Sequence, residues 1–217
     1  MKVCLLTTEA RSLFHFHFAC EEREVRVDSC ILLGSLEDRK VNRNSNLIEY
    51  CVHNSIRVAI LDSRDNLVQY LGNVGPDILV LDITTLIGKD ILKIPTLGTL
   101  NSHSGFLPTY RGFDCRRWAI LTKGIVGRTL HWVDSGIDTG NILWRRTYIV
   151  RPRDTIKSLA RRAYFFGKWQ DIAETLKKLQ ARDYQVYSEA QELEAGKRYY
   201  WMHPELRQIV DELLERI

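Results

Sequence analysis

The sequence predicts an α/β fold built on a Rossmann-like, doubly wound and mostly parallel sheet with helices on both faces. Short apolar runs alternate with helical patterns at the spacing of right-handed β-α-β units. One of these runs, Ile78 to Leu81, is continuously apolar, as expected for a parallel strand covered on both faces. The 217 residues, 45% of them hydrophobic, suffice for one globular domain. We expect a main domain at 1–183 and a short carboxyl-terminal extension at 184–217.

In the first half of the chain, the pattern places strands and helices in alternation. Runs rich in Val, Ile and Leu predict the strands, and apolar residues at helical spacing predict the helices. A polar stretch at 37–46 predicts a loop. The expected strands are 1–7, 27–34, 57–61, 78–81 and 99–101, and the expected helices are 13–22, 47–54 and a segment ending near Gly72.

In the second half, a short helix at 116–123 precedes strands at 129–133 and 141–150, which are joined by a hairpin-like loop. A long helix is expected at 154–180, with Asp154-Thr155 as its cap and Gly167 as a weak point. Aromatic segments follow at 184–187 and 196–201. The last helix begins at Pro204, and its apolar side carries Leu206, Ile209, Val210, Leu213 and Ile217.

Composition excludes several classes of protein. A formal charge of +4 is too small to make nucleic-acid binding the default. Residues 101–150 hold seven Lys/Arg against three Asp/Glu, which suits a small anionic substrate or an ordinary solvated basic face. The chain has no signal-peptide pattern and no apolar run long enough to span a membrane, so we expect a soluble, cytoplasmic protein.

Familiar ligand motifs are missing from the sequence. The five cysteines are an odd, scattered set without a C-x-x-C pair, which favours free, buried or half-buried thiols over disulfides or zinc. His15 and His17 stand two residues apart and cannot share a helix face, so they are expected to be packing or surface residues. Neither G-x-G-x-x-G nor a P-loop motif is present.

The stretch from Leu100 to Gly140 carries the candidate chemistry. Asn101 and His103 project from the same side of a strand, because side chains alternate with a period of two. Asp138 lies 35 residues after His103 (138 − 103), so only folding can bring these two together. A turn-forming role beside Gly136 and Gly140 is the alternative for Asp134 and Asp138. Arg111 is a fixed positive charge that can reach a phosphate or carboxylate.

Four linked motifs give this stretch a specific resemblance. Asn-x-His at 101–103, Leu-Pro-x-Tyr-Arg-Gly at 107–112, Gly-x-Thr at 127–129 with His131, and Gly-Ile-Asp-Thr-Gly at 136–140 resemble the folate-dependent formyltransferases. That family includes glycinamide ribonucleotide, methionyl-tRNA and sugar N-formyltransferases. The chain departs from its pattern at Ser104 and at Gly105-Phe106, where relatives often carry Pro and Ser-Leu.

The resemblance implies a catalytic trio of Asn101, His103 and Asp138, with N10-formyltetrahydrofolate as formyl donor and no metal requirement. It implies that Asn101 and His103 stabilise the oxyanion while Asp138 orients the imidazolium and accepts a proton. We interpret His131 as a packing residue, with a second catalytic role as the alternative. The pterin is expected between the loops at 82–87 and 133–138, with Asp82, Ile83, Thr84, Leu86, Val133, Asp134, Gly136 and Ile137 as its binding residues.

The regions outside this stretch favour a nucleoside-diphosphate aminodeoxysugar as the acceptor. The loop after the first strand lacks the glycine-rich pattern of the purine-pathway member, and only 67 residues (217 − 150) follow Val150, fewer than the tRNA-acting pattern adds. The tail is similar to those of sugar N-formyltransferases, and its aromatics are expected either to stack on a base or to form a homodimer core. Transfer to another small amine and a catalytically silent ligand-binding domain are the alternatives. The candidate acceptor-binding residues are Arg11, Ser12, Tyr110, Arg111, Gly112, Tyr200 and Trp201.

Overall fold

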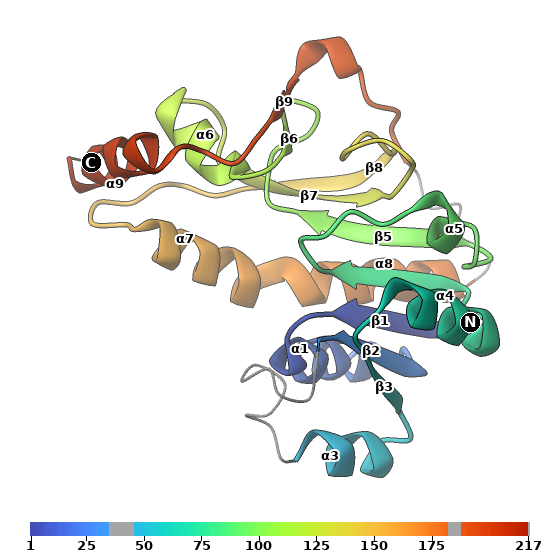
Figure 1. Ribbon diagram of the computed structural model, residues 1–217. Helices are drawn as coiled ribbons and strands as arrows, with labels where there is room; N and C mark the ends of the chain where they lie inside the picture. Colours follow the sequence, from blue (N-terminus) through green and yellow to red (C-terminus); the bar gives the residue numbers. More distant parts are fainter. Residues whose placement is uncertain (35–45, 182–187, 217) are drawn as a thin grey trace. The chain divides into compact units, whose positions relative to one another are not determined.

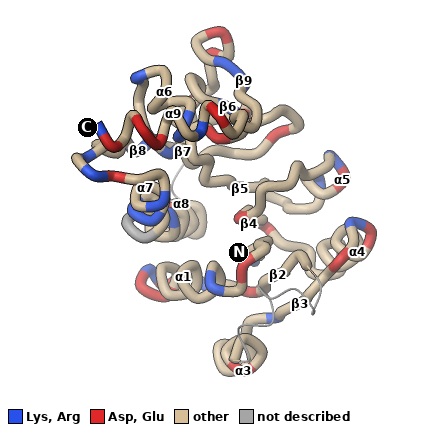
Figure 2. The backbone as a smooth tube through the Cα atoms, turned by 60° about the vertical axis from the view of Figure 1, so that its left-hand side comes forward, with Lys and Arg blue, Asp and Glu red and all other residues tan. Residues whose placement is uncertain are grey.

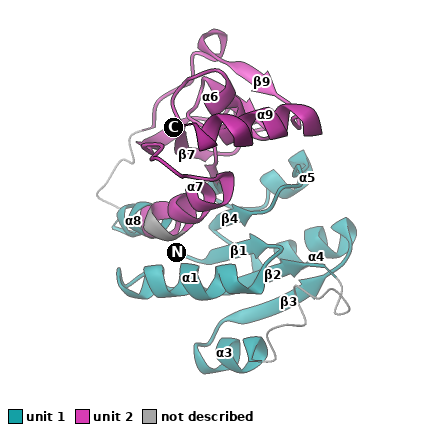
Figure 3. Cartoon of the chain, turned by 90° about the vertical axis from the view of Figure 1, so that its left-hand side faces the viewer, with its two compact units in different colours: residues 1–101, 172–185 teal, residues 102–171, 186–217 magenta. Residues whose placement is uncertain are grey.

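A computed structural model describes residues 1–34, 46–181 and 188–216, which form two compact units (Figure 3). Unit 1 comprises residues 1–101 and 172–185, and unit 2 comprises residues 102–171 and 186–217. The described part of the predicted extension therefore belongs to the same unit as residues 102–171. The predicted loop at 37–46, apart from Asn46, and the aromatic segment at 184–187 lie outside the described residues.

The predicted α/β fold is confirmed, with seven strands in the order β3-β2-β1-β4-β5-β7-β8 (Figure 1). The unit boundary falls within β5. Strands β1 to β5 pair in parallel, with Leu5 of β1 opposite both Cys30 of β2 and Val80 of β4. Apolar side chains of β1, β2 and β4 are buried, as expected for covered parallel strands. The five strands are Val3–Thr7, Ser29–Leu33, Arg57–Leu61, Ile78–Asp82 and Gly98–His103.

The helices of unit 1 connect these strands. They are α1 (Ala10–Glu21), α3 (Leu47–His53), α4 (Arg64–Val74) and α5 (Lys89–Leu92), of which α5 was not predicted. Helix α4 continues past Gly72 because Gly75, at φ 55°, supplies the left-handed residue that ends it. Helix α1 begins at Ala10, so Arg11 and Ser12 are helical and not in a loop as predicted.

Unit 2 contains a hairpin and a small second sheet. Strands β7 (Gly127–Trp132) and β8 (Ile142–Thr147) are antiparallel, whereas β6 (Tyr110–Gly112) and β9 (Lys197–Tyr199) pair in parallel. A 3₁₀ turn, η2 (Leu193–Ala195), precedes β9. Helices α6 (Cys115–Leu121) and α9 (Pro204–Glu215) share one apolar core, which joins the end of the chain to the unit. The buried members of that core are Tyr110, Cys115, Ala119, Ile120, Val126, Leu159, Met202, Val210 and Leu214.

The long helix predicted at 154–180 is continuous but not uniformly α-helical. It consists of α7 (Ile156–Ala163), a π-helical turn (Tyr164–Lys168) and α8 (Trp169–Gln180). Thr155 caps it through a capping box with Ser158. The π turn contains Gly167, the predicted weak point, where a Cβ would lie 2.9 Å from Asp171 Oδ2. A π turn is a common form of local irregularity in α-helices.

Two helices of unit 2 carry charges that are mostly of opposite sign. Figure 2 shows basic residues along α7 and acidic residues along α9. The basic residues of α7 are Lys157, Arg161 and Arg162, and the acidic residues of α9 are Glu205, Asp211, Glu212 and Glu215.

In the part of the chain that the structure describes, no helix is both long and apolar enough to cross a membrane.

Candidate active site

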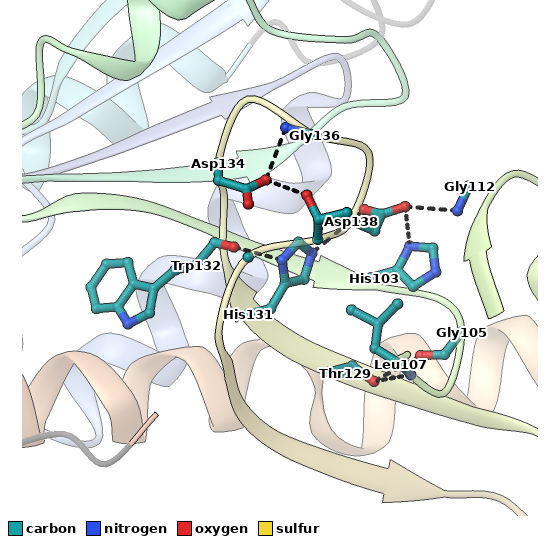
Figure 4. Close-up of polar contacts among 12 residues, drawn as sticks. His103, Gly105, Leu107, Gly112, Thr129, His131, Trp132, Asp134, Gly136 and Asp138 are labelled. Atoms are coloured by element: carbon teal, nitrogen blue, oxygen red, sulfur yellow. Dashed lines mark hydrogen bonds and ion pairs between the residues drawn. The ribbon is translucent and has the colours of Figure 1, made fainter. Parts of the chain in front are cut away.

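Folding brings His103 and Asp138 together within unit 2 (Figure 4). His103 ends β5, and its Nδ1 lies 3.3 Å from Asp138 Oδ2, with side-chain exposures of 6% and 14%. The same carboxylate oxygen accepts the backbone N–H of Gly112 at 2.9 Å. Asp138 is therefore more than a turn former, because its half-buried carboxylate lies beside an imidazole and is held by a peptide group.

His131 of β7 is a second imidazole in contact with this carboxylate. It is 1% exposed, and its Nε2 lies 3.5 Å from Asp138 Oδ1. Its Nδ1 lies 2.7 Å from the carbonyl oxygen of Trp132, so Nδ1 carries the hydrogen. His131 is thus buried, as predicted, and it also contacts Asp138, which the sequence analysis missed because β7 and the 134–140 loop gave no signal of that pairing.

The tautomer of His103 follows from its other nitrogen. Nε2 lies 2.8 Å from the carbonyl oxygen of Tyr110, and a carbonyl only accepts, so Nε2 carries the hydrogen. In neutral His103 the nitrogen facing Asp138 therefore bears a lone pair. Gly105 permits this arrangement, since a Cβ there would lie 2.4 Å from the Tyr110 carbonyl oxygen and 2.6 Å from Nε2. Steric exclusion of a Cβ thus explains why this chain has Gly105 where relatives often carry Ser.

Burial and charge act on this pair in opposite directions. Burial lowers the pKa of His103 below 6.5, against the opposing effect of Asp138. Burial would raise the pKa of Asp138, but His103, His131 and the Gly112 N–H outweigh it and lower that pKa to about 2. Near pH 7 we assign a neutral His103 beside an ionised Asp138. In this state the pair can accept one proton between the two side chains.

The loop after His103 is held by the Gly-x-Thr motif. Thr129 Oγ1 donates to the carbonyl oxygen of Gly105 at 2.8 Å and accepts the N–H of Leu107 at 3.0 Å. Arg145 of β8 donates through Nε to the carbonyl oxygen of Leu107 at 2.7 Å. These bonds fix the backbone next to the imidazole, which explains why a hydroxyl is needed on β7.

On the opposite side of β5 from His103, Ser102 joins an ionic network. Its Oγ accepts a hydrogen bond from Arg128 Nη1 at 2.7 Å, and Arg128, 3% exposed, also pairs with Asp171. Arg146 donates to Asp171 Oδ1 at 2.7 Å. Gly167 lies against this network, where a Cβ would be 3.0 Å from Arg128 Nη2. The network anchors the end of the strand that carries His103.

Asp134, in the same loop as Asp138, is a turn former. Its Oδ1 accepts the N–H of Gly136 at 3.0 Å and the hydroxyl of Thr139 at 2.6 Å. Both Asp134 and Gly136 are exposed, whereas Val133 and Ile137 are half-buried. The turn-forming role, which was the alternative for both Asp134 and Asp138, therefore applies to Asp134.

The remaining predicted ligand residues of unit 1 lie at strand ends and in α1. Asn101, on β5, is half-buried. Asp82 ends β4 and accepts a hydrogen bond from Thr7 Oγ1 at 2.9 Å. In the loop that follows, Ile83 is half-buried, and Thr84 and Leu86 are exposed. Arg11 is exposed, while Ser12 is fully buried in α1 and does not face solvent.

The candidate acceptor residues of unit 2 differ in how they are used. Arg111 Nη2 donates to the carbonyl oxygens of Leu193 and Gly196, so this cation already binds the chain segment before β9. Tyr110 is buried in the apolar core. Tyr200 and Trp201, in contrast, are 62% and 58% exposed.

The five thiols and His17 lie outside the site, in packed surroundings. All five cysteines are free and buried, as predicted. His17 Nδ1 lies 2.7 Å from the Tyr50 hydroxyl, in keeping with a packing residue. Among residues 1–34, 46–181 and 188–216, no group of three His, Cys, Asp or Glu is arranged to hold a metal ion.

Comparison with known proteins identifies the family. The chain is 38% identical over 102 residues to the methionyl-tRNA formyltransferase of Methylacidiphilum infernorum, a match that covers 46% of this chain and 32% of that protein. The chain thus spans about a third of the length of that relative.

Two solved structures share the fold. Glycinamide ribonucleotide transformylase 1 from Symbiobacterium toebii aligns with a TM-score of 0.69 and 21% identity, covering 88% of this chain and 94% of that one. The formyltransferase PseJ from Anoxybacillus kamchatkensis, solved with UDP-4,6-dideoxy-4-formamido-L-AltNAc and tetrahydrofolate, aligns with a TM-score of 0.59 and 20% identity over 100% and 99% of the two chains. The family model described as formyl transferase matches residues 1–175, and the chain therefore belongs to the formyl transferase family.

Proposed function

We propose that this protein transfers a formyl group from N10-formyltetrahydrofolate to the amine of a nucleotide-linked aminodeoxysugar. Membership of the family gives formyl transfer, and the donor and acceptor are the proposed parts. The observation that carries the chemistry is the pair formed by buried His103 and half-buried, ionised Asp138, 3.3 Å apart. A packed core has no need of such a pair, whereas a proton-accepting site does.

The reaction follows from the protonation state of the pair. The neutral amine of the acceptor attacks the formyl carbon, and the bond between that carbon and N10 of the donor breaks. The amine loses a proton to the His103–Asp138 pair, where the proton lies between Nδ1 and the carboxylate, and N10 gains a proton as tetrahydrofolate leaves. The lowered pKa of His103 keeps Nδ1 free to accept near neutral pH.

The developing oxyanion needs a hydrogen-bond donor, and we assign this role to the Asn101 amide. The sequence predicted that His103 would share it. However, the Nε2 hydrogen of His103 goes to the Tyr110 carbonyl at 2.8 Å. Asn101 is on the same strand two residues away, so its side chain shares a face with His103. A single preorganised donor contributes about 2.7–4 kcal/mol to such a transition state.

For the formyl donor, we retain as binding residues those that the sequence predicted at 82–87 and at 133–138. Leu86, 64% exposed in the loop after β4, is an apolar side chain that a pterin ring could cover. The exposed loop around Asp134 and Gly136 is supported by its own hydrogen bonds. The PseJ structure contains tetrahydrofolate, which supports a folate donor for a chain with the same fold.

For the acceptor, the exposed aromatics before α9 favour a nucleotide. Trp201 stacks on Phe113 with ring centroids 4.7 Å apart and has the Arg207 guanidinium 6.0 Å from its ring centroid, and Arg198 lies 5.0 Å over the ring of Tyr200. Aromatic faces beside guanidinium groups suit a base and a diphosphate. The exposed rings of Tyr200 and Trp201 also suit a homodimer interface, which is the alternative role for these two residues.

A panel of acceptors tests the proposal. The protein is incubated with N10-formyltetrahydrofolate and, separately, nucleotide-linked aminosugars, glycinamide ribonucleotide and methionyl-tRNA, and tetrahydrofolate release is followed. The methionyl-tRNA arm is included because of the 38% identity to that class. We expect turnover with an aminosugar. Turnover of glycinamide ribonucleotide or methionyl-tRNA alone would reject the acceptor, and no release in any arm would favour a silent binding domain.

A further inference from the structure

The segment that follows residue 187 runs beside the start of β8. Glu189 and Ile142 exchange both backbone hydrogen bonds, at 2.7 and 2.8 Å, in an isolated antiparallel bridge. Arg145 Nη1 also pairs with Glu189 at 2.9 Å. This bridge places Gln191 next to the loop that carries Asp138, all within unit 2.

Gln191 binds the backbone of that loop with both hydrogens of its amide. Its Nε2 donates to the carbonyl oxygen of Asp138 at 3.0 Å and to that of Gly140 at 2.6 Å. The two carbonyls only accept, so the NH₂ group and not the oxygen must face them. Gln191 Oε1 is buried without a hydrogen-bond partner among the described residues, so the side chain gives up one bond to make these two.

The backbone that Gln191 holds is strained. Asp138 has φ 52°, in the left-handed region that a residue other than glycine rarely adopts, at a cost of about 1 kcal/mol or more. Fixing the carbonyls at Asp138 and two residues beyond sets the direction of the Asp138 side chain. A second hold comes from β9, where Tyr199 pairs with Gly112, whose N–H donates to Asp138 Oδ2.

We propose that Gln191 is a positioning residue that keeps the Asp138 carboxylate against His103. Its catalytic consequence rests on the proposed formyl transfer, but its geometry does not. The chain after residue 187 thus helps to build the reactive pair, in addition to any part in acceptor binding. The other titratable groups that act on the pKa of His103 are His131 and Arg116.

The first test needs no substrate. The His103 ring is titrated by NMR in wild type and in Gln191→Ala, with Gln208→Ala as control, an exposed glutamine on α9. Because Asp138 raises the pKa of His103, moving the carboxylate away lowers that pKa, by about half a unit to one unit. No change in the folded Gln191→Ala protein would overturn the proposal.

The second test separates positioning from packing. Gln191→Glu keeps the size of the side chain but replaces the donor by an acceptor facing two carbonyls, so we expect kcat to fall about tenfold or more, and further than in Gln191→Ala, with KM for both substrates little changed. If Gln191 only fills space, Gln191→Ala should lower kcat more than Gln191→Glu does. That result would refute the positioning role. If wild type transfers formyl to no acceptor while the NMR shift is present, the proposed function fails and the positioning role stands.

Discussion

The two units of this protein differ in the polar side chains that they bury. Among the described residues, those of unit 1 are mainly hydroxyls, with His17 as the ionisable exception: Thr7, Ser12, His17, Ser29, Thr99 and Thr175. Those of unit 2 are mainly ionisable: His103, Arg128, Thr129, His131 and Asp154. Burying a neutral hydroxyl costs far less than burying a charge, and buried charge persists only where partners are arranged around it. On the mechanism that we propose, unit 1 supplies mainly a packed sheet and unit 2 the proton chemistry.

The largest expected effect is that of removing the carboxylate from the reactive pair. Asp138→Ala should lower kcat by about a hundredfold to ten-thousandfold, because the proton accepted from the amine loses its stabilising charge. Ser135→Ala is the control in the same loop, since Ser135 is exposed and is not among the candidate site residues. Tetrahydrofolate release measures both variants. Equal losses would mean that the loop, and not the Asp138 carboxylate, carries the effect.

Next in size is the cost of an unpaired buried cation in unit 2. Asp171→Ala leaves Arg128, 3% exposed, without its carboxylate and should lower the free energy of unfolding by about 3 kcal/mol. In unit 1, Asp90→Ala breaks the exposed pair with Arg64 and should change the free energy of unfolding much less, because solvent screens the pair. Urea denaturation compares the two. Similar losses would contradict the contrast between the units.

The pH dependence of kcat reports the state of His103. A lowered pKa means that His103 stays neutral, and able to accept a proton, until the pH falls below 6.5. We therefore expect kcat to be flat from pH 7.5 to 6.5 and to fall about tenfold per unit at lower pH. An acid limb above pH 6.5 would place the proton acceptor elsewhere.

Asp138 also links pH to stability. Its folded pKa of about 2 is below the ordinary value of 3.8, so its contribution to stability is complete above pH 4 and is lost as the pH falls toward 2. In Asp138→Ala, this part of the acid destabilisation should be absent. Thermal unfolding between pH 5 and 2 measures the difference, and identical curves for wild type and variant would contradict the ionised, stabilised carboxylate.

The smallest expected effects are those of the helix caps, which should not distinguish the units. Thr155 caps α7 in unit 2 and Ser63 caps α4 in unit 1, each by accepting a backbone N–H. Replacing either by Ala should cost about 1 kcal/mol with kcat unchanged. A fall in kcat for one of them would show that its helix end influences the site.

The strands and most helices could be predicted because their signals are local. The apolar run Ile78 to Leu81 and the Thr155 cap are legible within a few residues of sequence. Strands β6 and β9 were missed because each has three residues and forms only through pairing between positions more than eighty apart. The extent of α1 was misjudged at its start, where Arg11 and Ser12 look like loop residues but are helical.

The candidate site was predictable in its residue types and not in its contacts. Motifs named His103 and Asp138, but the second imidazole on the carboxylate, His131, was interpreted as a packing residue, with a second catalytic role as the alternative. Nothing in the sequence around Gln191 signals its two bonds to the 138–140 backbone, because they depend on a bridge formed by tertiary folding. Arg111 was expected to bind a phosphate, yet its guanidinium binds two carbonyls of the chain.

The central claim is that the His103–Asp138 pair takes the proton of the attacking amine. Its most direct test is the single-turnover rate of formyl transfer by folded His103→Ala, with the acceptor that the panel identifies. The account predicts a fall of about a hundredfold or more relative to wild type. A near-wild-type rate in a protein with unchanged thermal stability would contradict it.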